Sequence, residues 1–410
     1  MASRTIRLLF WTREEFPTSR VDVEILFCRE LVGRGHVIDF VMQASRPDIR
    51  PGRHDWHGRS VFVGPTAAGG TMRQFLRHWL GLWHDLASLR LAVRSQYDAL
   101  QVRDKFVIAS IAVIVARLRG LRFFFWLSFP FPEADIIRAR ERLARQPAFA
   151  RLRGALSGWL LYHWILPRAD HAFVQSEVMK QDFVARGLNA LRLTAVPMGV
   201  DLDDIPAAVD AVQRQAGSDI LLGYLGALDA DRQLHMLVDM LADLRRSGMP
   251  ARLLLIGDAY KPEDRELLRR RAAECAVLPF LEITGLLPRL EALRRMKQVD
   301  IALSPIYPSP MYRVASPTKL VEYLALELPV VANDHPEQRR ILEASRAGVC
   351  APWGSRHFAR GVRWLMHRSP AQRSEMGARG RAWVEQHRTY SKIADRLESS
   401  YLQLLTEPTP

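Results

Sequence analysis

The sequence predicts two α/β domains, each built on a parallel sheet with helices on both faces. Short, continuously apolar stretches recur along the chain and are separated by amphipathic segments of helical period. This pattern is typical of buried parallel strands connected by helices. The chain has 410 residues, 48% of them apolar, which is enough to fill two cores. We therefore expect two facing Rossmann-like domains, which bind ligands at the carboxyl ends of their strands.

The first half of the chain alternates strands and helices up to about residue 200. Its first helix is expected to end at Gly33-Arg34-Gly35, because glycine adopts the left-handed conformation of a helix cap. The expected strands are Ile6–Phe10, His36–Met42, Ser60–Val63, Ala99–Val102, Arg122–Leu127, His171–Val174 and Arg192–Val196. The expected helices are Val21–Val32, Met72–Arg94, Phe106–Leu118, further helices within Glu133–Leu166, and Glu177–Arg186.

The second half repeats the pattern after a stretch rich in turn formers and weak in periodicity. We expect an N-terminal domain over residues 1–200, a linker over 201–217 and a C-terminal domain over 218–385. The expected strands are Ile220–Leu225, Arg252–Ile256, Leu281–Thr284, Asp300–Leu303, Val330–Ala332 and Val349–Cys350. The expected helices are Arg232–Arg246, Arg289–Met296, Pro317–Leu326, Glu337–Ala344 and several within Arg356–Leu405.

The charge balance is strongly basic, with 58 Lys and Arg against 44 Asp and Glu and a net charge of +14. Only six of the 58 cations are lysines, which points to a codon bias toward arginine. A surface that meets phosphate is the functional alternative. The arginines are spread along the chain and no nucleic-acid-binding module is present, so we expect no nucleic-acid partner.

The cysteines and the apolar runs restrict the compartment. Three cysteines, far apart in sequence, offer no spacing for a metal or redox site and fit a reducing compartment. The start of the chain lacks the pattern of a signal peptide. The longest apolar runs, Phe106–Ala116 and Ala155–Leu166, are too short to span a bilayer. We expect a cytoplasmic protein, soluble or peripherally attached to the membrane.

The most informative segment is Ser316–Ala325, which reads SPTKLVEYLA. Serine followed by proline marks a helix start, with Ser316 as the cap. The start of a helix binds phosphate through free N–H groups, and Lys319 adds a full charge there. Glu322 lies one turn further, about 4.5 Å along the axis, where a carboxylate can bind a ribose diol. A plain Lys–Glu ion pair on a solvated helix face is the alternative.

The run from Ser316 to Ala332 resembles the donor-site signature of the retaining GT-B glycosyltransferases of family 4, also called group 1. Further resemblances to that family follow in the family's order and extend over nearly the whole chain. They are Gly33–Val37, Ala169–Glu177, Val196–Asp201 and Gly223–Leu228. The resemblance implies the GT-B fold, with a C-terminal helix over residues 386–410 that packs back on the N-terminal domain.

In the family a glycine loop and two cations hold the diphosphate of the donor. The resemblance places Gly226 in that loop, Arg232 and Lys319 as the clamp, and Glu322 on the ribose. Ser316 and Thr318 at the helix start complete the implied donor-binding set. A plain turn at Gly226 and a solvated Arg232 in the first helical turn are the alternatives that the residues alone leave open.

Two positions depart from the family pattern. The family often has a second acidic residue eight positions before Glu322, and here that position is Val314. Arg313, Ser316 or backbone groups would have to contact the donor sugar instead. The first loop, residues 16–20, has no glycine pair, and its Arg20 is expected to reach the phosphates or the acceptor unless it is a surface arginine.

On the acceptor side, Arg103 and Asp104 follow a predicted strand and take the places of a histidine and an acidic residue in relatives. A structural ion pair, or a helix N-cap by Asp104, is the alternative. Ser128 follows the neighbouring strand and is expected to contact the acceptor or the sugar, whereas Trp126 is expected in the core. Asp104, Arg232 and Lys319 are the residues that we expect to act in catalysis.

The implied reaction transfers a sugar, by expectation a hexose, from a UDP- or GDP-sugar with retention and without a metal or other cofactor. Arginine and tryptophan along 72–94 and 138–168 indicate an anionic membrane surface and a lipid-linked or polysaccharide acceptor. Apolar faces buried in the core are the alternative for both segments. A non-catalytic polyanion-binding protein and a nucleotide-sugar epimerase of the same architecture are the alternative functions.

Overall fold

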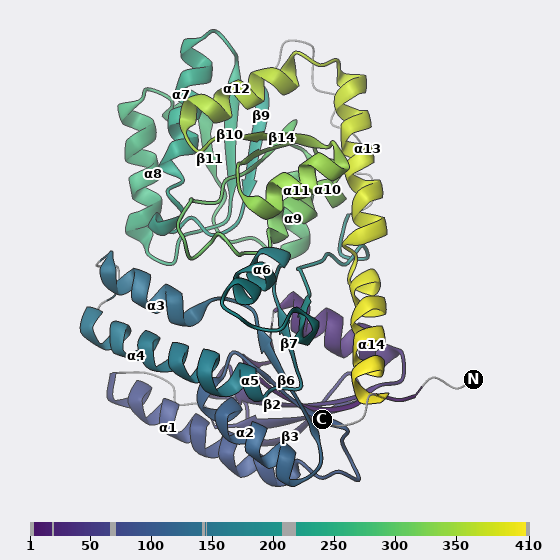
Figure 1. The fold of residues 1–410 in the computed structure, drawn as a ribbon. Helices are drawn as coiled ribbons and strands as arrows, with labels where there is room; N and C mark the ends of the chain where they lie inside the picture. The colour runs from purple at the N-terminus through teal and green to yellow at the C-terminus, as the bar shows by residue number, and fades with distance from the viewer. Residues whose placement is uncertain are drawn as a thin grey trace. The chain divides into compact units, whose positions relative to one another are not determined.

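The computed structural model describes residues 4–18, 20–65, 71–141, 144, 146–206 and 219–406, without the side chains of residues 71–78. The chain divides into two compact units (Figure 1). Unit 1 comprises Met1–Pro197 with Tyr390–Pro410, and unit 2 comprises Met198–Thr389. Residues 207–217 of the expected linker lie outside the described part of the chain.

Unit 1 is built on a sheet of eight strands in the order β3-β4-β2-β1-β5-β6-β7-β8. All neighbours pair in parallel except β3 and β4, which form an antiparallel hairpin. The edge strand β3 is polar and largely exposed, so hydrophobic periodicity did not predict it. The strands are β1 Arg7–Phe16, β2 Val37–Ala44, β3 Gly52–Trp56, β4 Arg59–Gly64, β5 Ala99–Arg103, β6 Arg122–Leu127, β7 His171–Val174 and β8 Leu193–Ala195.

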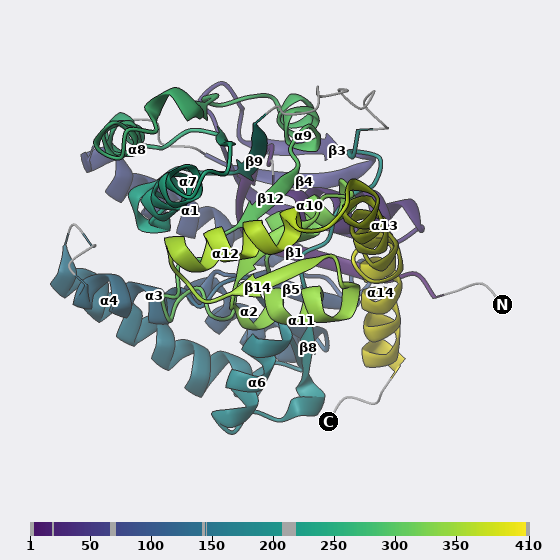
Figure 2. The ribbon, with the colours of Figure 1, turned by 90° about the horizontal axis from the view of Figure 1, so that it is seen from above.

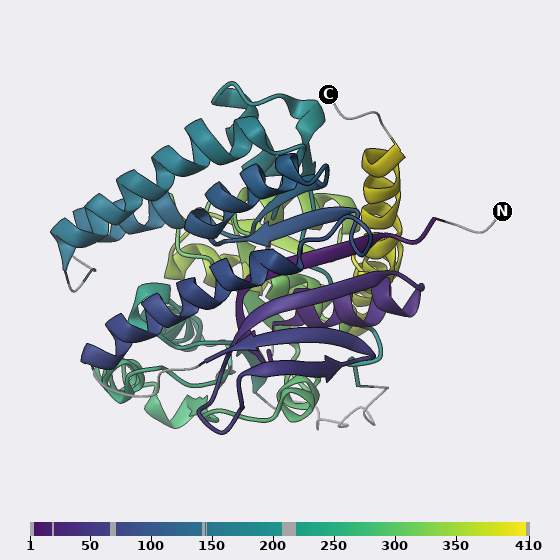
Figure 3. The same ribbon diagram turned by 90° about the horizontal axis from the view of Figure 1, so that it is seen from below.

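Helices cover both faces of this sheet (Figure 3). The π-helical η1 (Asp22–Leu31) and the last helix α14 (Tyr390–Thr406) pack together, and α14 buries Ile393, Leu397 and Tyr401 in the core of unit 1. The expected return of the C-terminal helix is therefore confirmed. The remaining helices of the unit are α1 Thr71–Ser88, η2 Leu89–Leu91, α2 Phe106–Leu118, α3 Phe131–Arg140, α4 Pro147–Trp159, η3 Leu160–Ile165, α5 Leu166–Arg168, α6 Glu177–Ala185 and η4 Ala190–Arg192.

The helices α3 and α4 form a close antiparallel pair in unit 1. Gly154 permits this contact, because a Cβ there would lie 2.7 Å from the carbonyl oxygen of Pro132 and 2.8 Å from Ile136. Ala150 and Gly154 face α3 and are buried. The opposite face of α4 therefore has no partner within the described part of unit 1.

Unit 2 is built on six parallel strands in the order β11-β10-β9-β12-β13-β14. Figures 1 and 2 show α7, α8 and α12 on one face and α9, α10 and α11 on the other, with α13 against α10. The strands are β9 Ile220–Leu225, β10 Ala251–Ile256, β11 Leu281–Ile283, β12 Ile301–Ser304, β13 Val330–Asn333 and β14 Gly348–Ala351. The helices are η5 Ala230–Arg232, α7 His235–Arg246, α8 Pro262–Glu274, η6 Leu278–Phe280, α9 Arg289–Lys297, α10 Thr318–Ala325, α11 Pro336–Ser345, α12 Ser355–Met366 and α13 Pro370–His387.

A buried histidine at the start of β7 makes the stability of unit 1 depend on pH. Burial, with a smaller effect of the Lys180 ammonium, lowers the pKa of His171 from 6.5 to about 4. The unfolded chain therefore binds a proton between these values while the folded chain does not, and stability falls as the pH falls. We expect this group to contribute a loss of up to about 3 kcal/mol between about pH 6.5 and pH 4.

Urea unfolding followed by tryptophan fluorescence, near pH 7 and near pH 4.5, measures this effect. The His171→Gln variant keeps a polar partner for the Thr194 hydroxyl, which lies 2.8 Å from Nε2 of His171. Its free energy of unfolding should change less with pH than that of the wild type. Equal pH dependence of the two proteins would show that His171 is not the group responsible.

Candidate functional site

The short helix α10 follows β12 of unit 2 after a loop over residues 305–317. Its first residue is Thr318, and Pro317 occupies the cap position. The expected cap by Ser316 is wrong: its hydroxyl accepts a hydrogen bond from the N–H of Met198 (2.9 Å) and makes no capping bond. Pro317 restricts the backbone φ angle at the start of the helix. Ser316 instead holds the main chain at Met198. The first N–H groups of α10 therefore have no side-chain cap.

Lys319 lies in the first turn of α10 against the loop that follows β9. Its Nζ donates to the Tyr224 hydroxyl (2.7 Å) and lies 4.6 Å from the centre of that ring. Among the described residues no carboxylate is within ion-pair distance of Lys319. The simple ion pair of Lys319 with Glu322, which the sequence left open, is therefore not formed. The Nζ of Lys319 can therefore contact an anion.

Gly226 makes room for that lysine. A Cβ at this position would collide with Cε and Nζ of Lys319, and the backbone has a φ of 147°. Only glycine adopts this conformation at low cost. The helix is tied to the same loop by Tyr323, whose hydroxyl accepts from the N–H of Leu225 (2.9 Å). Gly226 and Lys319 therefore belong to one rigid contact, which is more than the turn that the sequence alone suggested.

Glu322 is buried one turn further along α10 and is paired with a residue that the sequence analysis missed. Nη1 of Arg289, the first residue of α9, lies 2.9 Å from Oε1 of Glu322, and its Nε lies 3.3 Å from Asp204. Burial raises the pKa of Glu322, and the Arg289 and Lys319 charges offset part of that shift. The second carboxylate oxygen makes no other hydrogen bond within the described chain.

Arg232 ends the turn η5 and precedes α7, which begins at His235 and not at Arg232 as expected. Its guanidinium lies 5.5 Å from the ring of Tyr312, and the Tyr312 hydroxyl donates to Asp231 (2.9 Å). Nε of Arg232 is buried without a hydrogen-bond partner in the described structure. Arg232 therefore precedes the helix α7, and its Nε is a donor that can still form a hydrogen bond.

The loop between β12 and α10 carries the departure from the family pattern. The side chain of Val314 is buried, whereas that of Arg313 is exposed. His335 holds the loop through a hydrogen bond of its Nε2 to the carbonyl of Tyr312 (2.9 Å). The missing acidic side chain is replaced in the core of the loop by an apolar one.

A second cluster lies in unit 1, at the carboxyl ends of β5 and β6. Asp22 joins its members: Oδ2 lies 2.7 Å from Nη2 of Arg103, and Oδ1 lies 3.0 Å from Nε of Arg20. Asp104 follows, with Arg103 at 3.4 Å, and accepts hydrogen bonds from the N–H and the hydroxyl of Ser128. Of the residues predicted on the acceptor or sugar side, Arg20, Arg103 and Ser128 thus belong to one network with Asp104, whereas Arg313 lies in unit 2.

Arg103 is fully buried and holds the two carboxylates, while its Nη1 has no hydrogen-bond partner in the described structure. Burial raises the pKa of Asp104, which Arg103 and the Ser128 bonds only partly offset. Burial also raises the pKa of Asp22, but Arg103 and Arg20 more than offset that effect, so its pKa lies below the usual value. Ser128 and Arg20 are the partly exposed members that can contact a substrate.

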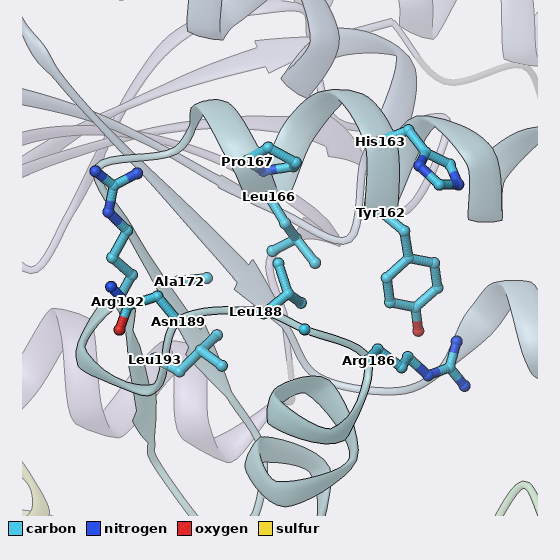
Figure 4. A pocket seen from close by; sticks show the side chains of 11 residues that line it. Tyr162, His163, Leu166, Pro167, Ala172, Arg186, Leu188, Asn189, Arg192 and Leu193 are labelled. Carbon is cyan, nitrogen blue, oxygen red and sulfur yellow. The ribbon is translucent and has the colours of Figure 1, made fainter.

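Two further observations concern a pocket and metal binding. A pocket of about 650 Å³ in unit 1 is lined by Tyr162, Arg186 and neighbouring residues and contains none of the predicted site residues (Figure 4). Within the described part of the chain, no group of three His, Cys, Asp or Glu side chains is arranged to hold a metal ion.

Two units built on parallel sheets, with Lys319 and Glu322 in α10 and Gly226 in the loop after β9, are what a glycosyltransferase of the GT-B fold is expected to have. Two family models match the chain: "Glycosyltransferase Family 4" over residues 25–204 and "Glycosyl transferases group 1" over residues 219–368. The chain belongs to the family 4, or group 1, glycosyltransferases. The resemblance on which the sequence analysis rested is therefore confirmed.

Known relatives and structures agree with this family. A GDP-mannose-dependent alpha-(1-6)-phosphatidylinositol dimannoside mannosyltransferase of Mycobacterium tuberculosis is 30% identical over 202 residues, which are 48% of this chain and 49% of the relative. The match thus spans about half of that curated relative. Sucrose-phosphate synthase from Thermosynechococcus elongatus has a similar fold, with a TM-score of 0.73 at 16% identity over 97% of this chain and 99% of its own. HepE of Anabaena, in complex with UDP and glucose, has a TM-score of 0.66 at 15% identity over 96% and 99%.

Removal of the Arg289 partner should destabilise unit 2, because Glu322 would remain buried without its cation. The guanidinium is 43% exposed, so solvent screening reduces the effect, and we expect Arg289→Met to cost about 1–2 kcal/mol near pH 7. The loss should be smaller at pH 5 than at pH 7, because the raised pKa of Glu322 lets this carboxyl group bind a proton more readily as the pH falls. Chemical unfolding at both pH values measures it.

The matched control is the same substitution in the Glu322→Gln background. Because the neutral amide does not need the arginine, Arg289→Met should cost clearly less there. An equal loss in both backgrounds would mean that Arg289 acts through packing alone and not through the carboxylate.

Proposed function

We propose that this chain transfers a hexose from a UDP- or GDP-sugar to an acceptor hydroxyl, with retention at the anomeric carbon. The observation that carries the proposal is the start of α10. Within the described residues, α10 begins with an ammonium that has no carboxylate partner and with backbone N–H groups that have no side-chain cap, and a buried carboxylate follows one turn later. This order matches the diphosphate and ribose of a nucleotide-sugar donor.

In this proposal Lys319, Arg232 and the first N–H groups of α10 bind the diphosphate. Their charges stabilise the nucleoside diphosphate as it leaves, and stabilisation of this kind supplies a large part of a transferase's rate enhancement. Arg232 can bind phosphate through two N–H groups at once. No metal is required for this step, because the protein's own cations are placed to take the charge.

Glu322 binds the ribose hydroxyls through the carboxylate oxygen that Arg289 does not contact, while Arg289 orients the carboxylate. Thr318 lies at the helix mouth beside the phosphates, whereas Ser316 acts by fixing the chain at Met198. Arg313 takes over the contact to the donor sugar that the acidic residue at position 314 makes in relatives. Its exposed side chain is the charged group nearest in sequence to that position.

On the acceptor side we propose that Ser128 and Arg20 contact the acceptor and that Asp104 orients Ser128. The raised pKa of Asp104 makes it a better proton acceptor than an ordinary carboxylate, in keeping with a catalytic role. The relatives support a nucleotide-sugar donor in general. HepE was solved with UDP and glucose, and the mycobacterial relative depends on GDP-mannose, so the choice of base and sugar is left to the test.

Lys319→Ala and Glu322→Gln should each lower transfer at least about a hundredfold, because each removes a charge that contacts the donor. Donor binding to a panel of UDP- and GDP-sugars, by saturation transfer, and slow release of the nucleoside diphosphate measure the effect. Lys261→Ala is the matched control, since it removes an exposed lysine of the same unit at the start of α8. It should act like the wild type.

The outcome also separates the alternative functions. Wild-type transfer by both variants would remove this site from the mechanism. A sugar that is changed in configuration but not transferred would indicate an epimerase, and no binding of any nucleotide sugar would leave a non-catalytic polyanion-binding protein.

We further propose that the acceptor is lipid-linked or part of a cell-surface polysaccharide and that unit 1 binds the cytoplasmic face of an anionic membrane. Four apolar side chains of α4, which carries no acidic residue, are between 55% and 66% exposed: Phe149, Leu152, Leu156 and Trp159. Their spacing places them on one side of the helix. Arg151 and Arg153 are exposed on the same helix, and such a combination suits a lipid interface.

The second predicted membrane segment is only partly described. Trp79 and Trp83 of α1 are 50% and 67% exposed, whereas the side chains of Phe75 and Leu76 lie outside the described features. Of the helices in the described ranges, none combines the length and the apolar character that crossing a bilayer requires. The proposed attachment is therefore by a helix face.

Sedimentation with vesicles tests the attachment. The protein should bind phosphatidylglycerol-containing vesicles more strongly than phosphatidylcholine vesicles, and Leu152→Ser with Leu156→Ser should weaken binding about tenfold. The control pair Leu267→Ser with Leu286→Ser removes two exposed leucines of unit 2 and should leave binding unchanged. Equal binding to both vesicle types would refute the electrostatic part, and equal binding by both variant pairs would refute the role of α4.

A further inference from the structure

A basic pocket of about 870 Å³ lies in unit 1. It is found at the opposite ends of the strands from the Asp104–Ser128 cluster. Arg122 begins β6, His171 begins β7 and Leu193 begins β8, and all three line the pocket. It therefore opens at the amino ends of these strands, whereas the predicted acceptor-side residues follow the carboxyl ends of β5 and β6. The helix α14 closes one side with Ser400 and Gln403.

Positive charge is concentrated in this pocket well beyond the average of the chain. Five of its sixteen lining residues are cations, against 58 of 410 in the whole sequence. They come from five separate elements or their ends: Arg117, Arg122, Arg168, Lys180 and Arg192. An arginine-rich composition alone spreads charge evenly and does not gather five cations around one cavity.

The single carboxylate of the lining does not neutralise this charge. Asp170 accepts one hydrogen bond on each oxygen, from the N–H of Phe123 (2.7 Å) and from Nη1 of Arg122 (3.0 Å). Arg122 is thereby paired, and the other four cations have no acidic residue in the lining.

Lys180 and Arg192 are the two cations of the lining whose charge is not used elsewhere in the described structure. In the described structure neither side chain makes a hydrogen bond or an ion pair. Arg117 and Arg168 donate only to main-chain carbonyls, those of Arg168 and of His163 and Trp164. Arg192 also borders the pocket of about 650 Å³ that Tyr162 and Arg186 line. In Figure 4 its side chain lies far from those of Tyr162 and Arg186. Like charges held together without a counter-ion repel one another and destabilise the fold.

The rest of the lining suits a ligand that combines phosphate with an organic part. Thr194, Asn189 and Ser400 offer neutral hydrogen-bonding groups, and Leu191 and Leu404 offer apolar surface. The volume is that of sites for small organic ligands. His171 contributes a neutral ring held by Thr194.

We propose that this pocket binds a ligand that carries at least two phosphate charges, with Lys180 and Arg192 as the principal contacts and Arg117 and Arg168 in support. The ligand is either a free phosphorylated metabolite or the phosphate headgroup of a lipid. The site is separate from the start of α10, which belongs to the other unit, and it does not depend on the proposed transferase activity.

Lysine acetylation, read residue by residue with mass spectrometry, tests the site in the unmodified protein. The chain has only six lysines, so each one reports a different place. Inorganic pyrophosphate should slow the acetylation of Lys180 several-fold and leave Lys261 and Lys392 unchanged. Protection of Lys319 reports the α10 site independently. Unchanged acetylation of Lys180 at saturating pyrophosphate would overturn the proposal, whatever happens at Lys319.

Calorimetric titration with pyrophosphate gives the second measurement. Lys180→Gln with Arg192→Gln should weaken binding about tenfold or more in a Lys319→Ala background, which removes the α10 site. The control pair Arg46→Gln with Arg50→Gln removes two exposed charges between β2 and β3, near the other edge of the sheet, and should change binding less than twofold. Equal weakening by both pairs would mean unspecific attraction to a basic protein and would overturn the site.

A short-chain phosphatidic acid, kept below its micelle concentration, distinguishes the two sources of phosphate. Stronger protection of Lys180 by this lipid than by pyrophosphate identifies a headgroup site, and weaker protection identifies a site for a free metabolite. Both results support the pocket, since each requires Lys180 to be covered by phosphate.

Discussion

The close approach of Lys319 to the backbone at Gly226 is the contact on which the site of unit 2 depends. The lysine side chain passes where any other residue at position 226 would place its Cβ. The carbonyl oxygen of Gly226 lies, in turn, where a Cβ of Gly257 would be. Two glycines with positive φ therefore let β9, β10 and α10 converge at one edge of the sheet. The helix start and its cation are brought against this loop, and Tyr323 fixes the distance.

Both functional clusters hold buried charges in hydrogen-bonded groups of three or more residues. Glu322 is paired with Arg289, which also binds Asp204, and Arg103 lies between Asp22 and Asp104. Such arrangements contribute little to net stability, because removing charges from water costs about as much as their attraction returns. Their value here is in geometry: each carboxylate has one orientation and a pKa moved away from its ordinary value. In each cluster an arginine orients the carboxylates: Arg103 is fully buried, whereas the side chain of Arg289 is 43% exposed.

Much of the fold and part of the site could be predicted from the sequence. The parallel strands are continuous apolar runs, which the hydrophobic pattern of a sequence predicts well. The polar edge strand β3 was not predicted, because its exposed residues form no apolar pattern. Lys319 and Glu322 were predicted because they belong to one contiguous motif, and Arg103, Asp104 and Ser128 because each follows a predicted strand. Arg289, Tyr224 and Asp22 were missed, since their roles arise only from side chains far apart in sequence. Arg289 did stand at an expected helix start, and that was the signal available.

The sequence by itself determined the class of fold, the family and the residue types at the start of α10, because these depend on local periodicity and on a contiguous motif. Only the tertiary structure decided which side chains interact with one another. In it, the hydroxyl of Ser316 accepts a hydrogen bond from Met198 and does not cap the helix, and Glu322 forms an ion pair with Arg289 and not with Lys319. It also gathered five cations around one cavity at the amino ends of β6, β7 and β8. Contacts of this kind join residues up to a hundred or more positions apart, and they exist only once the parallel strands have placed their ends side by side.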